Sequence, residues 1–224
     1  MLEMSFNDES RDEVVQFVRF KTADHIPVDL FQQSWIAAAE EFYARGVSKV
    51  IFSEKQALNG DLNPYKFISK NFWPSPEAVK CSFPGGLPSP SSRGHVTVSQ
   101  AGVFKLEHMV VADGSKVLHN SIYKAGFKAL TMIPLCDKSF PKETVLEYAD
   151  YLVSLKGFQT LGVYGLHISS GPHKEWLYEW IIEALFNSIN TSPESVLKEL
   201  KNCPNAVEKW EISIHRDYMQ MVAS

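Results

Sequence analysis

Helical periodicity is strongest in two segments of the chain. Between Phe31 and Phe42, bulky apolar side chains recur at every third or fourth position, and a proline precedes this run while Gly46 follows it. Proline in the first turn and glycine just past the last turn are the usual ends of an α-helix. Residues 141–156 show the same features, so the pattern predicts helices over residues 27–45 and 141–156.

Two weaker helical patterns lie elsewhere in the chain. Apolar residues on one side of residues 10–20 predict a short helix there, and residues 172–190 begin with a proline and carry an apolar stripe at helical spacing. Ser192 followed by Pro193 predicts the start of one more short helix, because serine caps a helix and proline suits its first position.

Runs of β-branched and aromatic residues predict the strands. We expect strands over residues 49–54, 95–100, 102–112, 160–168 and 208–222, and either one bent strand or two over residues 117–135. The segments on either side of Ala101 and Gly102 are expected to form a hairpin that turns at these residues. Because strands and helices are mixed without strict alternation, we predict an α+β fold, with a twisted mixed or mostly antiparallel sheet and helices packed on it.

Proline, glycine and serine are dense over residues 56–94. This density of helix- and strand-breaking residues predicts an irregular region without long helices or strands. A loop of this length is typical of a lid, a binding loop, a flexible insertion or a boundary between two lobes. The aromatic residues within it indicate that it packs against other parts of the protein. We expect a single domain over residues 1–224 that includes this region.

Composition narrows the class of protein. The chain has 224 residues, 45% of them hydrophobic, and a formal net charge of −4, which is typical of a globular protein. It lacks a long basic tract, which argues against a nucleic-acid partner. Its three cysteines are widely spaced, which argues against a disulfide framework or a cysteine zinc site. The sequence shows neither a signal-peptide pattern nor an apolar run of about 20 residues, so we expect a cytoplasmic protein without membrane contact.

Two short motifs carry the candidate chemistry. His95 is followed two positions later by Thr97, and His167 by Ser169, each within an expected strand. Side chains two positions apart in a strand share a face, so each histidine is expected to lie beside a hydroxyl. Paired strands of this kind resemble the active site of the two-histidine phosphoesterases.

The resemblance implies metal-independent phosphoester or related anion chemistry that needs no cofactor. One histidine would act as base and the other as acid, since imidazole exchanges protons near neutral pH, and the hydroxyls of Thr97 and Ser169 would bind phosphate. Ser170 and Gly171 lie at the start of the expected following helix, where free backbone amides favour an anion.

Arg93 and Lys124 are the candidate supplementary charges for such a groove. A purely structural interpretation is also open. In that case Ser170 caps the helix, Pro172 opens it, and the histidine-hydroxyl pattern is a frequent one that recurs at His119–Ser121.

A second functional class is a non-catalytic, self-associating binding module. Trp176, Tyr178 and Trp180 crowd one expected helix, aromatic side chains are favoured at interfaces, and two-fold pairs are the commonest assemblies. This interpretation predicts a homodimer. The histidines lack metal-binding spacing, so no metal site is expected. The candidate ligand is a small anion, and the non-catalytic class predicts a small-ligand-binding or self-associating module.

Overall fold

The structure is a computed structural model, and the residues that it describes are 12–55, 65–82, 95–112, 128–134, 141–169, 179–186, 198 and 210–222. Its contacts group into two compact units. The N-terminal unit consists mainly of Asn7–Lys105, and the C-terminal unit mainly of Leu106–Leu166 and Leu177–Tyr218. The expectation of a single domain stays a prediction.

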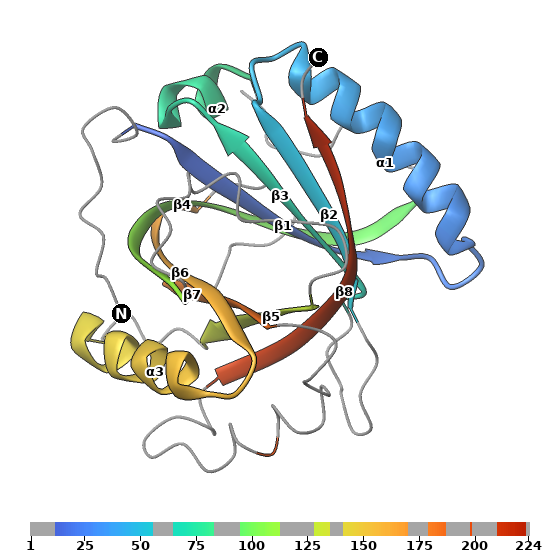
Figure 1. Ribbon diagram of the computed structural model, residues 1–224. Coiled ribbons are helices and arrows are strands. Elements are labelled where there is room, and N and C mark those ends of the chain that lie inside the picture. The colour runs from blue at the N-terminus through green and yellow to red at the C-terminus, as the bar shows by residue number, and fades with distance from the viewer. Residues whose placement is uncertain are drawn as a thin grey trace. The chain divides into compact units, whose positions relative to one another are not determined.

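The N-terminal unit is an antiparallel sheet with helices. The strands lie in the order β4-β1-β3-β2, and every neighbouring pair is antiparallel. Its elements are β1 (Val14–Thr22), α1 (Val28–Tyr43), β2 (Lys49–Lys55), β3 (Phe67–Trp73), α2 (Pro76–Ser82) and the first part of β4 (Val96–Val111), which are labelled in Figure 1.

The C-terminal unit repeats this plan, with strands in the order β8-β5-β7-β6 and antiparallel pairing throughout. The last part of β4 lies beside β6, since the Ala112 amide donates to the Gln159 carbonyl at 2.8 Å. The elements of this unit are β5 (Lys128–Pro134), α3 (Lys142–Ser154), β6 (Phe158–Ser169), β7 (Trp180–Phe186) and β8 (Trp210–Val222).

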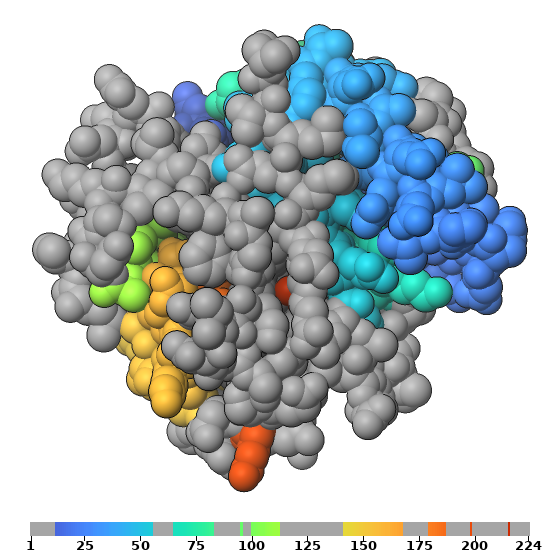
Figure 2. All heavy atoms as spheres, turned by 45° about the vertical axis from the view of Figure 1, so that its right-hand side comes forward, coloured from blue at the N-terminus to red at the C-terminus, as the bar shows by residue number. Residues whose placement is uncertain are grey.

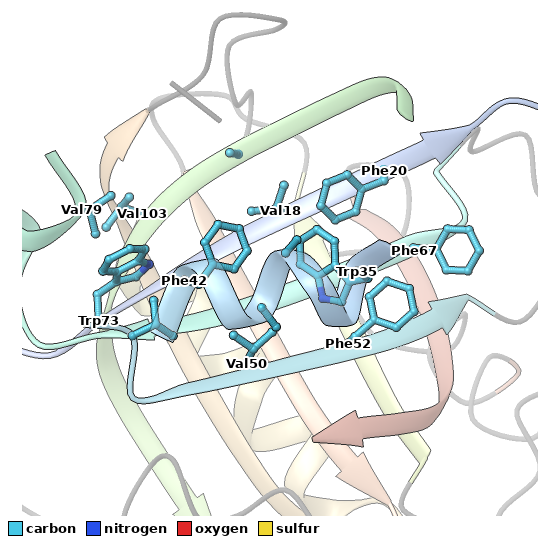
Figure 3. Close-up of a cluster of buried hydrophobic side chains, with 14 of the residues drawn as sticks. Val18, Phe20, Trp35, Phe42, Val50, Phe52, Phe67, Trp73, Val79 and Val103 are labelled. Carbon is cyan, nitrogen blue, oxygen red and sulfur yellow. The ribbon is translucent and has the colours of Figure 1, made fainter. Parts of the chain in front are cut away.

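An aromatic core fills the space between α1 and its sheet. In Figure 3, Trp35 and Phe42 extend from α1 among side chains of the strands. The Trp35 ring lies 4.9 Å from that of Phe20 and 5.7 Å from that of Phe52, measured between centroids. The outer side of α1 is drawn in blue at the surface in Figure 2. The apolar stripe predicted over residues 27–45 is therefore the buried face of α1.

The α+β prediction is confirmed, with antiparallel strand pairing in both units. The helices expected over residues 27–45 and 141–156 are confirmed as α1 and α3. Gly46 and Gly157 follow them with φ values of 95° and 86°, a conformation that glycine adopts without strain. The strands expected over residues 49–54, 160–168 and 208–222 are β2, β6 and β8, and β5 lies within residues 117–135.

The helix expected over residues 10–20 is wrong, because this segment contains β1. Almost every side chain of β1 is buried, on both faces of the sheet. A strand with two buried faces has no polar alternation. Its run of valines and phenylalanines therefore resembled one side of a helix.

The helix expected over residues 172–190 is wrong for the same reason. Residues 180–186 form β7, whose side chains from Ile181 to Phe186 are all buried. A short, continuous apolar run does not distinguish a buried strand from a buried helix. Trp176 and Tyr178 lie outside the described residues, as does the helix start expected at Ser192 and Pro193.

The hairpin expected at Ala101 and Gly102 is also wrong, since β4 runs straight through these residues. Ala101 is paired with Val18, and Gly102 with Phe17, so both take part in the ladder with β1. Gly102 therefore lies opposite Phe17 within the ladder and does not make a turn.

The irregular region expected over residues 56–94 contains two regular elements, β3 and α2. All seven residues of β3 are buried, and the strand lies between β1 and β2. The proline, glycine and serine residues on either side of β3 made the whole segment look irregular in the sequence. Residues 56–64 and 83–94 lie outside the described part of the chain. No helix of the described part is long and apolar enough to cross a bilayer, and the cytoplasmic location stays a prediction.

Candidate functional site

The register of the N-terminal sheet defines two faces. Val14 lies opposite Trp73 and Phe20 opposite Phe67, and all four belong to the core beneath α1. We call this side the helix face. The alternate residues, such as Arg19 in β1, point to the other side, which we call the opposite face.

A polar cluster interrupts the aromatic core on the helix face. Gln16 is paired with Asn71 across β1 and β3, and its side-chain oxygen accepts hydrogen bonds from Asn71 Nδ2 and Trp73 Nε1, each at 3.2 Å. The Ser69 hydroxyl donates to Asn71 Oδ1 at 2.9 Å. All four residues are 0% exposed. We call these four residues the amide cluster.

The amide cluster ends in a donor that is not satisfied. Because two N–H groups point at Gln16 Oε1, the orientation of this amide is fixed, and Nε2 must donate elsewhere. Gln16 Nε2 has no hydrogen-bond partner among the described residues, and neither has the indole nitrogen of Trp35, also in this core. Buried polar atoms are usually paired. The helix face therefore carries two buried N–H donors that have no acceptor among the described residues.

The opposite face carries buried positive charge. Arg19 and Lys70 are 5% and 0% exposed. Arg19 Nε donates to Gln100 Oε1 at 2.7 Å, and its guanidinium carbon lies 4.2 Å from the centre of the Tyr65 ring. Lys49 is buried on the same face, and this burial lowers the pKa of its ammonium below the usual 10.5, against the opposing effect of the Glu13 carboxylate.

His95 is held against α1. Its Nδ1 atom lies 2.8 Å from Ser34 Oγ, and the Ser34 hydroxyl also donates to the Leu30 carbonyl at 3.1 Å. The single proton of Ser34 can go to the Leu30 carbonyl or to His95 Nδ1, and the tautomer of His95 sets the direction of their hydrogen bond. His95 Nε2 is the ring nitrogen that takes no part in this hydrogen bond.

His167 is exposed near the end of β6. A Cβ atom added at Gly165 would lie 3.3 Å from Cγ of Glu107, so these residues are neighbours across β6 and β4. The strands run antiparallel, which brings His167 beside the part of β4 near Lys105. His95 precedes that point by about ten residues, or roughly 30 Å of extended chain. The register does not favour a groove shared by the two histidines.

The remaining candidate residues are less defined. Thr97 and Ser169 lie in β4 and β6 as expected, but their side chains are not described. The other predicted site residues, Ser170, Gly171, Arg93 and Lys124, lie outside the described residues. Within the described ranges, no group of three or more histidine, cysteine or acidic side chains could hold a metal ion.

Sequence reasoning missed the amide cluster, although a signal was present. β1 reads VVQFVRFKT and β3 reads FISKNFW, so each places polar residues among large apolar ones. A polar residue at a core position of a strand is a stronger sign of a functional site than a histidine on a polar segment. The signal was lost because residues 10–20 were expected to be helical and residues 56–94 irregular.

No family model and no curated protein matches this chain. Solved structures do match over nearly its whole length. The chain shares their fold. An "anthrone oxidase-like protein" has 10% sequence identity and a TM-score of 0.57, with 96% of this chain and 95% of that chain covered.

Two further matches have similar scores. A "putative monooxygenase" from Fusobacterium nucleatum has 8% identity and a TM-score of 0.54, with 94% of each chain covered. A "putative monooxygenase" from Lactobacillus acidophilus has 8% identity and a TM-score of 0.51, with 95% of this chain and 97% of that chain covered. At such low identity the likeness establishes the fold, which is α+β.

Proposed function

We propose that this protein binds a small aromatic molecule through an acceptor oxygen on the helix face and oxidises it. The observation that carries the proposal is the unsatisfied Gln16 Nε2 donor at the end of the amide cluster. Trp35 Nε1 supports it as a second buried donor on the same face. Both donors lie in an aromatic core, where leaving an N–H group unpaired costs about 1–3 kcal/mol.

The chemistry of the donors defines the ligand. Gln16 Nε2 and Trp35 Nε1 donate only, so their partner must be an acceptor such as a ketone, phenolate or enolate oxygen. A flat aromatic body would have to displace part of the packing among the rings of Phe20, Trp35 and Phe42, and its own contacts with these rings would replace it, because aromatic pairs gain energy beyond their buried area. Anthrone, a tricyclic aromatic ketone, combines these features, and it is the molecule in the name of one structural neighbour.

The reaction class follows from the same donors and from the names of the neighbours. Loss of a proton from the CH2 group of anthrone places negative charge on the ketone oxygen. Preorganised N–H donors stabilise such an oxyanion. Oxidation by O2 then converts the CH2 group to a second carbonyl, with one oxygen atom retained in the product and the other released in water.

The test uses a variant that removes one donor and keeps the ring. We expect Trp35→Phe to weaken anthrone binding by about 10- to 150-fold, since a hydrogen bond to a charged or polarised oxygen is worth roughly 1.5–3 kcal/mol. Calorimetry would measure the binding and an oxygen electrode the O2 uptake. Trp180→Phe, in the C-terminal unit, is the matched control. Equal anthrone affinity of wild type and Trp35→Phe, or no binding by either, would contradict the proposal.

Phosphoester chemistry is a second candidate, favoured by the Ser34–His95 hydrogen bond. This contact orients the imidazole of His95 and leaves Nε2 for proton transfer. Hydrolysis of bis(p-nitrophenyl) phosphate by wild type, His95→Gln and His167→Gln tests it, with His25→Gln as the exposed control. Loss of activity in both variants would support a joint role. Activity that survives either substitution would exclude it.

We propose that the protein assembles as a homodimer. It rests on the aromatic residues around Trp180 and on the frequency of two-fold pairs. Light scattering across a range of protein concentrations tests it, and a monomer at every concentration would contradict it.

A further inference from the structure

We infer that the opposite face of the N-terminal sheet binds a small oxyanion, a phosphate or a carboxylate. The site consists of Arg19, Lys70, Gln100 and Ser53, which we call the basic cluster. It lies on the other side of the sheet from the amide cluster. The inference is therefore independent of the proposed oxidation.

Strand register brings the basic cluster together. Arg19 is paired with Gln100 on one side and Ile68 on the other, and Ile68 is paired with Ser53. Three of the four residues thus lie in one row across β4, β1, β3 and β2. Lys70 is two residues from Ile68 and points to the same face. Since neighbouring strands are about 4.8 Å apart, a small anion on this face is within reach of these long side chains.

The guanidinium group of Arg19 is held in place before any ligand arrives. Gln100 Oε1 accepts from its Nε atom at 2.7 Å, and the Tyr65 ring lies under its plane at 4.2 Å. A planar, immobilised guanidinium is the side chain best suited to a carboxylate or phosphate. The arrangement provides a preorganised anion donor.

Ser53 supplies the observation that points to a ligand. Its side chain is 0% exposed, and its hydroxyl has no hydrogen-bond partner among the described residues. The register directs Ser53 to the same face as Arg19 and Lys70. A buried hydroxyl on the same face as two cations, with a proton to donate, matches an oxyanion that binds on this face.

Charge on this face is consistent with such a ligand. In the described part of the N-terminal unit, the buried charged side chains are Arg19, Lys49 and Lys70, all of them cations. Each makes interactions within the protein. Burial of positive charge is nonetheless costly in a medium of low dielectric constant. An anion on this face would reduce that cost.

Thermal unfolding in sodium phosphate, sodium acetate and sodium chloride of equal ionic strength tests the inference. We expect phosphate or acetate to raise the Tm of wild type above its value in chloride, because a ligand that binds only the folded state stabilises it. The more effective anion identifies the ligand as phosphate-like or carboxylate-like. No extra shift with either anion would overturn the inference.

Ser53→Ala separates binding from structure. Without oxyanion, this variant should be at least as stable as wild type, since it removes an unsatisfied buried hydroxyl. With oxyanion, its affinity should be about tenfold lower and its Tm shift correspondingly smaller. A shift equal to that of wild type would overturn the inference.

Ser69→Ala is the matched control. Ser69 is a buried serine of the same sheet, but it belongs to the helix face. Its substitution should lower the stability and leave the oxyanion-dependent shift unchanged.

Lys70→Met removes one of the two cations and should abolish the oxyanion-dependent Tm shift. Retention of the full shift by this variant would contradict the inference. If Lys70→Met does not fold, Ser53→Ala provides the test.

Discussion

The side-chain oxygen of Gln16 accepts a hydrogen bond from the indole nitrogen of Trp73 at 3.2 Å, in a core otherwise built of aromatic and aliphatic side chains. The two residues lie on neighbouring strands that are distant in sequence. Asn71 donates to the same oxygen. One acceptor thus satisfies two buried donors, and its loss would affect both.

Gln16→Leu is therefore expected to destabilise the protein strongly. It leaves Asn71 Nδ2 and Trp73 Nε1 without their acceptor, at about 1–3 kcal/mol for each unsatisfied buried group. The free energy of unfolding, measured in urea, should fall by about 2–5 kcal/mol. Gln33→Leu, at an exposed position of α1, should change it by less than about 0.5 kcal/mol. Equal effects of the two substitutions would show that the hydrogen bonds contribute little.

The stability of the protein at alkaline pH should depend on Lys49. Burial lowers the pKa of this ammonium in the folded state, so the folded protein binds fewer protons than the unfolded chain. Stability then rises with pH from the lowered folded pKa up to the unfolded value near 10.5, and the penalty of burial is fully present below that window.

Two variants of Lys49 isolate this effect. Lys49→Met removes the cation, so its stability advantage over wild type should be largest below the window and should shrink as the pH approaches about 10.5. Lys49→Arg keeps the charge at every pH and should gain nothing. Urea midpoints between about pH 8 and pH 10.5 provide the measurement. A difference between wild type and Lys49→Met that does not change with pH would contradict the assignment.

Gly46 ends α1 for a conformational reason. Its φ value is 95°, and a Cβ atom added there would meet nothing within 4 Å. Gly46→Ala should therefore cost about 1–2 kcal/mol through backbone strain alone. Gly46→Asn should cost less, because asparagine tolerates the left-handed conformation. Thermal unfolding would rank the three proteins, and an alanine variant as stable as wild type would exclude strain at this position.

Gly162 is limited by packing. A Cβ atom added there would lie 2.9 Å from the hydroxyl oxygen of Tyr164, whose side chain is fully buried. Gly162→Ala should lower the free energy of unfolding by about 1–3 kcal/mol. The same substitution in a Tyr164→Leu background should cost less, which a double-mutant cycle would show as coupling. Additive effects would mean that the ring is not the obstacle.

The sequence by itself determined the elements whose signals are local. The helices α1 and α3 follow from proline starts, apolar stripes and glycine ends, all of which are contained within one segment. β2, β6 and β8 follow from their composition, and the mixture of elements indicated an α+β fold. These features need no partner from elsewhere in the chain.

Only the tertiary structure decided the nature of β1 and β7. Both are apolar on two faces, so neither shows the alternation that identifies a strand. Their hydrogen bonds are made to other strands, β1 to β3 and β4, and β7 to β5 and β6. A buried strand is stabilised by neighbours that its own sequence does not contain.

The candidate sites depended on register even more strongly. Sequence reasoning could identify His95 and Ser169 by residue type, but it could not say which side chains meet. Gln16 contacts Asn71, 55 positions away, and Arg19 contacts Gln100, 81 positions away. A shift of one residue in either ladder would place these side chains on the wrong face. The sheet pairing, set by burial of the apolar faces, decided which polar groups became neighbours.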